Sequence, residues 1–337
     1  MTITAETLDR SRGLVAPALR LAVERLDPFT RLVVSYHLGW SDEQGVPTVA
    51  NPGKTLRPAL ALLAAEAVTG RPDPGLPGAV AVELVHNFSL LHDDLMDRDT
   101  ERRHRRTVWA VWGDATAVLA GDALLSLAHE VLTDADSPYG QAAGQAVAIA
   151  TRELIRGQVL DLAFEERNDV GLDECLDMAA GKTGALLGVS AAIGAILAGA
   201  PQQVVSCLSR FGAELGMAFQ LIDDLLGIWG SPAVTGKPVF SDLIARKKTL
   251  PVTWSLDHGG KPGRELAAWL RRESSPTEDE LQHAARLIER AGGREWAAQE
   301  ARRRVGLAEQ ALHEAGLDDL ARNRLGDLAH FVIERQS

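Results

Sequence analysis

Two short segments of the chain place paired aspartates among apolar residues. Residues 90–97 have the sequence LLHDDLMD, and residues 221–227 have the sequence LIDDLLG. A carboxylate inside an apolar helix is costly without a counter-charge, so we expect a cation at each segment. On a helix, Asp93 and Asp97 lie about 40° apart and one turn along the axis, where both can contact one small cation. Oxygen ligands alone favour Mg²⁺.

A histidine and several basic residues accompany the two acidic segments. His86 precedes Asp93 by two helical turns on nearly the same face, so it can point into the same cavity as the carboxylates. Acidic and basic residues together suit a polyphosphate that is bound partly through metal ions and partly by Lys and Arg. The basic candidates are Lys54, Arg57, Arg102, Arg103, Lys182, Lys237 and Lys247. The chain lacks the GxxxxGK[ST] spacing of a P-loop, so P-loop ATP hydrolysis is not supported.

Helical periodicity connects these segments along the whole chain. Leu and Ala recur at three- and four-residue spacing, and aromatic residues make up only 5% of the chain. These features predict an all-α protein and argue against a β-sandwich or barrel. A capping box from Thr277 to Glu280 predicts the start of a helix. The breaks between helices are too short to be domain linkers, so we expect a single domain over residues 1–337.

Composition limits the possible partners and the compartment. The 337 residues contain 35 Lys and Arg and 46 Asp and Glu, and the net charge of −11 argues against nucleic acid as a primary partner. Cys175 and Cys207 are far apart, which excludes a disulfide framework or a cysteine zinc site and fits a cytoplasmic protein. The N-terminus lacks signal-peptide features. We interpret the apolar residues 184–200 as a buried helix and not as a transmembrane segment.

The order of motifs resembles the trans-isoprenyl diphosphate synthase (polyprenyl synthetase) family. The motifs are PGKTLRP, VHNFSLLHDDLMD, RRHRRTVW, GKTG, AFQLIDDLLG and GKPVFSDLIARKKTLP, which extend from about Lys54 to Pro251. This resemblance implies a single all-α bundle around a deep central cavity, with the two acidic motifs facing each other across its mouth. It also implies a homodimer that joins isopentenyl diphosphate to an allylic diphosphate.

The same resemblance assigns roles to individual residues. The first acidic motif would hold Mg²⁺ bridged to the allylic diphosphate, and the second would contribute mainly its first carboxylate. The implied metal ligands are Asp93, Asp94, Asp97, Asp223 and Asp224. The residues that match positions binding isopentenyl diphosphate are Lys54, Arg57, His86 and Arg103, and those matching allylic diphosphate contacts are Arg102, Lys182, Lys237 and Lys247. Thr183 and Gln220 match positions whose oxygens lie near a carbocation.

The implied chemistry explains this division of charge. Breaking the allylic carbon–oxygen bond creates a carbocation and a diphosphate, so metal ions and basic residues are needed where negative charge develops. The alkene of isopentenyl diphosphate then attacks the cation. By family analogy, the proton lost in the last step goes to the departing diphosphate, and no protein nucleophile is needed.

Product length is expected to depend on Phe88 and Ser89, which occupy the fifth and fourth positions before the first motif. By resemblance, one large and one small residue there stop elongation at geranylgeranyl diphosphate, with a farnesyl or longer product as the alternative. An ideal helix places Ser89 about 40° from Asp93 and Phe88 about 140° away. Helix geometry therefore favours Ser89 as the lining residue, and the assignment of Phe88 follows from the resemblance.

The sequence departs from the family pattern at three places. Gly227 stands where a third aspartate is usual, so we expect weakened but not abolished Mg²⁺ binding, and we expect Gly227→Asp to be tolerated or helpful. Pro52-Gly53 replaces two glycines. His104 and Arg106 replace a glycine and a proline, which changes loop geometry, and we interpret Arg105 and Arg106 as solvated.

Two other functions share some of these features. A class I terpene cyclase would need a second motif of Asn or Asp, Ser or Thr, and Glu, but LLGIWGS follows Asp224. It would also not need the basic pocket for isopentenyl diphosphate. A non-catalytic partner subunit of a prenyl synthase is suggested only by Gly227, and the complete first motif argues against it.

Overall fold

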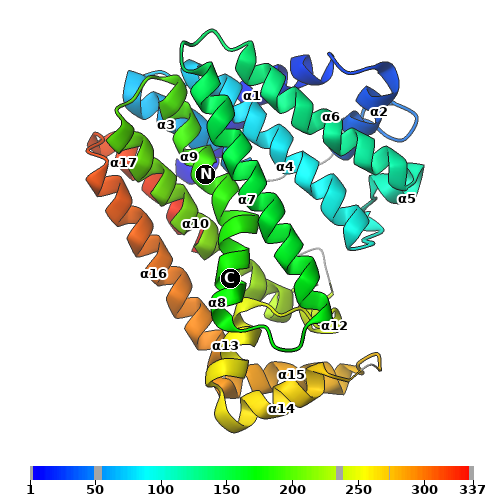
Figure 1. Ribbon diagram of the computed structural model, residues 1–337. Helices are drawn as coiled ribbons and strands as arrows, with labels where there is room; N and C mark the ends of the chain where they lie inside the picture. Colours follow the sequence, from blue (N-terminus) through cyan, green and yellow to red (C-terminus); the bar gives the residue numbers. More distant parts are fainter. Residues whose placement is uncertain (1–2, 49–54, 233–237, 273, 334–337) are drawn as a thin grey trace. The chain divides into compact units, whose positions relative to one another are not determined.

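The computed structural model describes residues 3–48, 55–232, 238–272 and 274–333 (Figure 1). Nearly all of the regular structure in these ranges is helical. The one sheet among the described residues is a two-stranded hairpin of β1 (Glu101–Arg102) and β2 (Arg105–Arg106). The predicted all-α class is therefore confirmed.

The chain forms two compact units. The first contains Met1–Ile149, Val189–Ser209 and Leu312–Asp327, and the second contains Ala150–Gly188, Arg210–Ala311 and Leu328–Ser337. The helices that contribute residues to both units are α7 (Gly140–Glu166), α9 (Ala185–Leu197), α10 (Gln202–Trp229), α16 (Gly293–Glu314) and α17 (Asp319–Ile333). The expectation of a single domain stays a prediction.

In the first unit, α4 provides the central helix. It runs from Leu76 to Met96, is buried along most of its length, and packs against α3 and α6. Figure 1 shows α4 and α6 side by side. The other helical elements that lie wholly in this unit are α1 (Ile3–Val23), α2 (Pro28–His37), α3 (Leu56–Thr69), η1 (Asp73–Gly75), α5 (Val108–Trp112) and α6 (Asp114–Thr133).

Small residues allow these helices to approach each other closely. A Cβ at Gly194 of α9 would lie 1.8 Å from the carbonyl oxygen of Ala61 on α3. A Cβ at Gly78 of α4 would lie 2.9 Å from the Ile193 side chain. The Ala- and Gly-rich composition of α9 thus serves backbone packing, since any larger residue would separate the helices.

The second unit is built around an aliphatic cluster. Leu221 and Leu225 of α10 pack with Leu250 of α13 (Leu250–His258), and all three are almost fully buried. The predicted capping box is confirmed, because Glu280 accepts from the backbone N–H of Thr277 at 3.0 Å and Thr277 caps α15 in return. The remaining elements are α8 (Leu172–Ala179), the π-helix η2 (Ala180–Gly184), α12 (Ser241–Ile244), α14 (Gly260–Leu270) and α15 (Glu278–Ala291).

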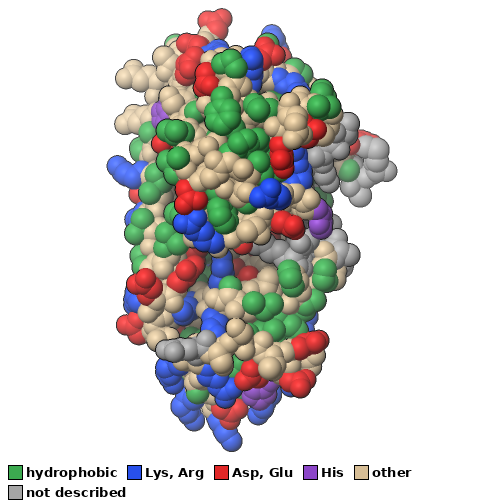
Figure 2. Space-filling view, turned by 90° about the vertical axis from the view of Figure 1, so that its right-hand side faces the viewer, with side chains coloured by type: hydrophobic (Ala, Val, Ile, Leu, Met, Phe, Trp, Pro, Cys, Tyr) green, Lys and Arg blue, Asp and Glu red, His purple; other side chains and the backbone are tan. Residues whose placement is uncertain are grey.

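Two helical stretches within the described ranges are long and apolar enough to cross a membrane by length and composition. In Leu172–Leu197 the apolar window is 78% buried, which agrees with the interpretation of residues 184–200 as a core helix. In α6 the window is only 39% buried. Figure 2 shows basic and acidic side chains interspersed on one face of the molecule.

The contact between Gly194 and Ala61 predicts a large packing effect. Gly194→Ala should lower the melting temperature by several degrees, since overpacking typically costs about 1–3 kcal/mol. Gly306→Ala on α16 is the matched control, because a Cβ there meets nothing within 4 Å. This control should be neutral or stabilising, as alanine is the better helix former. Equal melting temperatures for the two variants in thermal unfolding would contradict the close approach of α3 and α9.

Candidate active site

The first acidic motif lies at the C-terminal end of α4. Asp93 is half-buried in the last turn, and Asp97 caps the helix through its backbone N–H, which donates to the carbonyl of Asp93 at 2.8 Å. The two carboxylates therefore keep the one-turn spacing that the sequence predicted. Both side chains reach the surface in part, so a cation and a phosphate group could approach them together.

The second aspartate of the motif has a different environment. Asp94 is 2% exposed, and its Oδ1 accepts a hydrogen bond from Arg102 Nε at 2.6 Å. Burial raises the pKa of Asp94 to about 6, although Arg102 opposes this shift. Its Oδ2 is buried and has no hydrogen-bond partner. Asp94 thus already neutralises Arg102, and its expected role as a metal ligand stays a prediction.

Arg102 and Arg103 lie in the β1–β2 hairpin, directly after the acidic motif. Glu101 pairs with Arg106 and Arg102 pairs with Arg105, which leaves Arg103 and His104 as a two-residue turn. Both have positive φ, 52° and 61°, where a non-glycine residue typically costs about 1–2 kcal/mol. The departure from glycine at position 104 is therefore accommodated as backbone strain and does not unfold the turn.

Arg105 is not the solvated residue that the sequence suggested. Its side chain is half-buried, its Nη2 donates to the carbonyl of Ser41 at 2.7 Å, and its guanidinium lies 4.2 Å from the centre of the Tyr36 ring. Arg106 is exposed, as expected, although its guanidinium donates to the carbonyl of Ala110. The interpretation of Arg105 as solvated was wrong. Its partners Tyr36 and Ser41 precede it by more than sixty residues, so the local sequence did not reveal these contacts.

The candidates for binding isopentenyl diphosphate gather around α4. Arg57 lies in the first turn of α3, and His86 faces it from α4. Burial lowers the pKa of His86 well below its usual value, and the nearby Arg57 and Arg103 lower it further. His86 is therefore neutral at pH 7 and sits in a positive potential. Lys54, the fourth candidate, lies outside the described residues.

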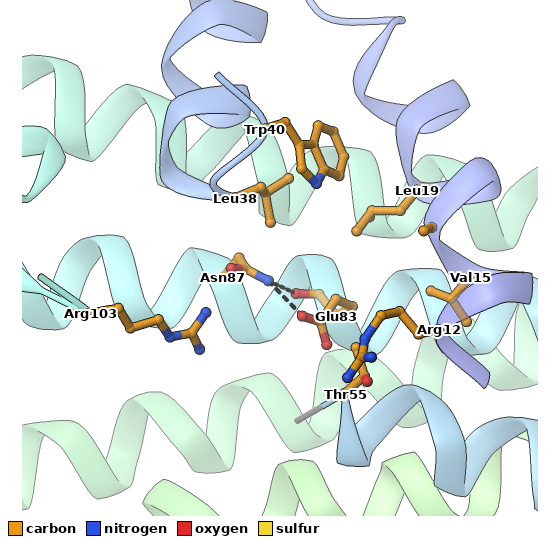
Figure 3. Close-up of a pocket in the computed structure, with 10 residues that line it drawn as sticks. Arg12, Val15, Leu19, Leu38, Trp40, Thr55, Glu83, Asn87 and Arg103 are labelled. Carbon is orange, nitrogen blue, oxygen red and sulfur yellow. Dashed lines mark hydrogen bonds between the residues drawn. The ribbon is translucent and has the colours of Figure 1, made fainter. Parts of the chain in front are cut away.

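A hollow of about 490 Å³, including space continuous with solvent, adjoins this cluster (Figure 3). Arg103 extends into it toward Asn87, and Asn87 Nδ2 donates to Glu83 Oε1 at 3.1 Å. Burial raises the pKa of Glu83, while Arg57 and Arg103 lower it. Glu83 is the one acidic side chain among the residues that line the hollow, so it supplies negative charge between these arginines.

The second acidic motif lies near the end of α10. Asp224 is 5% exposed, and its two oxygens accept from Gln220 Nε2 at 2.7 Å and from the backbone N–H of Leu250 at 2.8 Å. Burial, with Asp242 nearby, raises the pKa of Asp224 to about 8. Asp223 is the more exposed carboxylate of the pair. This arrangement agrees with a site that uses mainly the first aspartate.

The hydrogen bonds of Asp224 extend to the GKTG segment. Thr183 Oγ1 donates to Gln220 Oε1 at 2.6 Å, and Gln220 donates in turn to Asp224. The two residues expected near the carbocation are thus in direct contact. Because Thr183 uses its hydroxyl proton on Gln220, its oxygen lone pairs remain available to a positive centre.

Lys182 lies in the same π-helical segment and pairs with an acid that the sequence analysis did not single out. Its Nζ donates to Asp161 Oδ2 on α7 at 2.5 Å. Gly157 permits this contact, since a Cβ there would lie 2.2 Å from the backbone nitrogen of Lys182. A π-helix inside longer helical structure often marks a functional site. Asp161 could have been noticed as an acid in the otherwise apolar sequence QVLDLAF.

Gly227 has a spatial reason that the motif alone does not reveal. A Cβ at this position would lie 2.0 Å from Asp242 Oδ2. Ser241 Oγ also donates to the Gly227 carbonyl at 3.2 Å, which joins α12 to α10. The place beside Gly227 is thus taken by the Asp242 carboxylate, and the expectation that Gly227→Asp would be tolerated is revised.

The remaining candidates fall into three groups. Lys247 is half-buried just after α12, and its backbone N–H donates to the Asp242 carbonyl at 2.9 Å. Lys237, like Pro52-Gly53, lies outside the described residues. Phe88 and Ser89 are both buried on α4. The Phe88 ring packs edge-on against His92 at 4.8 Å, while Ser89 Oγ donates to the carbonyl of His86 at 2.8 Å.

The acidic side chains suit Mg²⁺ that is shared with substrate phosphates better than a metal ion enclosed by protein ligands alone. Among the described residues, no three His, Cys, Asp or Glu side chains converge to enclose an ion. Mg²⁺ is usually bound by one or two carboxylates together with substrate phosphates, and Asp93 and Asp97 provide such a pair. Asp223 provides a further, partly exposed carboxylate in the second unit.

Each unit thus brings together its own part of the predicted site. The first contains Arg57, His86, Phe88, Ser89, Asp93, Asp94, Asp97, Arg102 and Arg103, and the second contains Lys182, Thr183, Gln220, Asp223, Asp224 and Lys247. The meeting of the two acidic motifs across a cavity stays a prediction.

Comparison with known proteins identifies the relatives of this chain. Residues 41–288 match the model of the polyprenyl synthetase family. The chain is 59% identical to a (2E,6E)-farnesyl diphosphate synthase of Mycobacterium bovis, over 99% of this chain and 94% of that protein. It is 42% identical to a geranylgeranyl diphosphate synthase of Mycobacterium tuberculosis, over 91% and 88% of the two chains. A crystal structure of a polyprenyl synthetase from Streptomyces coelicolor A3(2) superposes with a TM-score of 0.94 at 49% identity, covering 98% of this chain and 99% of that one.

The contact between Gly227 and Asp242 can be tested by adding one methyl group. Gly227→Ala should displace the Asp242 carboxylate and lower kcat by about tenfold or more, as small displacements at an active site can do. Gly144→Ala on α7 is the matched control, because a Cβ there meets nothing within 4 Å. Asp242→Ala should cost a similar factor, and the double variant should cost little more than either single one. Wild-type turnover in Gly227→Ala would contradict this account.

Proposed function

The chain belongs to the polyprenyl synthetase family of trans-isoprenyl diphosphate synthases, and on that premise we propose that it joins isopentenyl diphosphate to an allylic diphosphate to form farnesyl diphosphate. The observation that carries this proposal is the cluster of basic side chains beside the first acidic motif. Arg57, Arg102 and Arg103 lie near a neutral His86. His86 and Asp93 both lie on α4, seven residues apart. An anionic group with several oxygens would complete this balance of charge.

In the proposed reaction, the first unit binds isopentenyl diphosphate and also the diphosphate that leaves the allylic substrate. Arg57 and Arg103 would bind the diphosphate of isopentenyl diphosphate, and neutral His86 would donate a hydrogen bond to it. Asp93 and Asp97 would hold Mg²⁺, which when bound would stabilise the negative charge of the departing diphosphate. Arg102, oriented by Asp94, would bind an oxygen of the same leaving group.

The second unit would stabilise the carbocation and the remaining negative charge. Lys182, held by Asp161, and Lys247 would contact the allylic diphosphate. Thr183 and Gln220 would direct oxygen lone pairs at the cation, and the bond between them fixes their orientation. Asp223 would bind a further Mg²⁺. The same assignment proposes Lys54 and Lys237 as diphosphate contacts.

For the product, farnesyl diphosphate replaces the geranylgeranyl diphosphate first expected. The support is the higher identity to the farnesyl diphosphate synthase, 59% against 42% for the geranylgeranyl enzyme. Phe88 and Ser89 do not distinguish these products by spacing alone. The Phe88 ring packs against the His92 ring, and His92 Nε2 lies 3.1 Å from the Val118 carbonyl on α6. Phe88 therefore also supports the packing of α4 against α6.

We also propose that the enzyme is a cytoplasmic homodimer. Its two described cysteines are buried and free, which suits a reducing compartment. The support for a dimer is α6, an apolar helix whose Val118 and Leu119 are 39% and 66% exposed. Packing against a second copy would remove this apolar surface from water, which is favourable.

The reaction itself is tested by incubating purified protein with Mg²⁺, isopentenyl diphosphate and each allylic starter, then separating the products by length. Farnesyl diphosphate should be the main product. Turnover should stop when a chelator removes Mg²⁺, because the aspartates and diphosphates would otherwise repel one another. Asp93→Ala should lower kcat by orders of magnitude. Activity that survives chelation would contradict the metal assignment, and an inactive wild type would favour a non-catalytic subunit.

The role of Phe88 in product length is tested by Phe88→Ala and Ser89→Phe. Phe88→Ala should add at least one isoprene unit if the ring limits the cavity, because filling apolar space is favourable by about 25 cal/mol per Å². Ser89→Phe should shorten the product, since this position shares a helical face with Asp93. Product chromatography would show both shifts. A change with Ser89→Phe alone would mean that Phe88 serves packing and not length control.

The proposed dimer is tested by a charge on the exposed face of α6. Leu119→Glu should shift the molecular mass toward a monomer in size-exclusion chromatography with light scattering, since a carboxylate would be buried without a partner. Leu320→Glu on α17 is the control, because Leu320 has a similar exposure of 62%. Two variants with the mass of the wild type would contradict an interface on α6.

A further inference from the structure

The hairpin that carries Arg102 and Arg103 contains an unfavourable turn. Two-residue hairpin turns with positive φ at both central positions favour Asn-Gly or Asp-Gly, whereas this chain has Arg103-His104. Strained residues of this kind persist only where the surrounding structure holds them. Contacts made by the hairpin should therefore reveal what keeps the turn in place.

One contact comes from α2. Tyr36 is 6% exposed, and its hydroxyl donates to the carbonyl of Arg106 at 2.8 Å. Its ring is held in turn by Trp112, which packs edge-on with centroids 5.0 Å apart. Burial raises the pKa of Tyr36, so its hydroxyl keeps the proton that it donates.

A second contact comes from the hairpin itself. The Arg105 guanidinium lies over the Tyr36 ring at 4.2 Å and donates to the Ser41 carbonyl at 2.7 Å. Stacking and hydrogen bonding together use the planar shape of arginine, which a lysine could not reproduce. Tyr36 and Arg105 thus tie β2 to α2 and to Ser41, and we call this pair the hairpin clamp.

The base of the hairpin is held independently. Thr107 Oγ1 donates to the carbonyl of Asp99 at 2.8 Å, and Trp109 Nε1 donates to the same carbonyl at 2.9 Å. Arg102 is fixed by Asp94. Arg103, at the turn, has neither of these anchors, and its backbone is the part that the clamp must hold.

We propose that Tyr36 and Arg105 are positioning residues, which hold the strained turn so that Arg103 is presented to the diphosphate of isopentenyl diphosphate. Figure 3 shows Arg103 extending toward Asn87, beside Glu83. This inference rests on the proposed function, because it needs Arg103 to bind that substrate. Neither clamp residue touches the substrate, and each acts through the backbone of the hairpin.

The first test removes each clamp contact alone. Tyr36→Phe deletes the hydroxyl and keeps the ring, and Arg105→Met deletes the guanidinium and keeps an unbranched apolar chain. Each should raise KM for isopentenyl diphosphate by about fivefold, the factor expected for one lost hydrogen bond, with kcat and the allylic KM changed less than twofold. The controls are Tyr139→Phe, in the chain's other tyrosine, and Arg294→Met, whose guanidinium lies 4.8 Å from the Trp229 ring. Both controls should behave as wild type.

The second test relieves the strain. His104→Gly removes the steric penalty of positive φ at one turn position, so the hairpin should depend less on the clamp. In that background, Tyr36→Phe should raise KM for isopentenyl diphosphate by less than twofold. Amide hydrogen exchange over residues 101–107 gives a readout without substrate: exchange should quicken in Tyr36→Phe and return toward the wild-type rate in the double variant.

The outcomes separate this inference from the proposed function. An equal rise in KM for both substrates, or an unchanged KM with Tyr36→Phe, would overturn the positioning role. Equal effects of Tyr36→Phe with and without His104→Gly would show that the clamp does not oppose turn strain, which would also overturn it. A wild type without prenyl transfer would refute the proposed function, while hydrogen exchange would still show whether the clamp holds the hairpin.

Discussion

The ion pair between Arg102 and Asp94 is the contact on which the first half of the site depends. Its Nε–Oδ1 distance is 2.6 Å, and the carboxylate is 2% exposed. A buried carboxylate needs a partner that satisfies its charge or its hydrogen bonds, and here Arg102, whose side chain is 30% exposed, supplies both. The pair therefore joins the hairpin to the end of α4. It also separates the roles of neighbouring aspartates, since Asp94 serves the protein while Asp93 and Asp97 remain accessible to a cation.

The same division occurs in the second unit by different means. Asp224 is satisfied by Gln220 and by the backbone of Leu250, so only Asp223 keeps a more exposed carboxylate. In both motifs the buried aspartate has a raised pKa because burial disfavours its charge. One carboxylate of each adjacent pair thus orients the helix and its neighbours, and the other is the more exposed to solvent.

Sequence reasoning predicted what depends on local spacing and missed what depends on distant contacts. Periodicity and short motifs predict the helical class, the spacing of Asp93 and Asp97 by one helical turn, and the capping box at Thr277. The structure shows each of these features. Arg105 could not be interpreted in this way, since its partners Tyr36 and Ser41 lie on another segment. Gly227 looked like a lost aspartate because the sequence does not show that Asp242 fills the adjacent space.

Charge balance explains why so many arginines can be held beside α4. Burial and nearby arginines keep His86 neutral, and they lower the pKa of His37 to about 3. Burial is the largest cause of both shifts, and the arginines add to it at each histidine. The acids that oppose it in this cluster are Glu83 and Asp94, and Asp94 is already paired with Arg102. A bound polyanion would add to the negative charge that Glu83 and Asp94 supply beside these arginines.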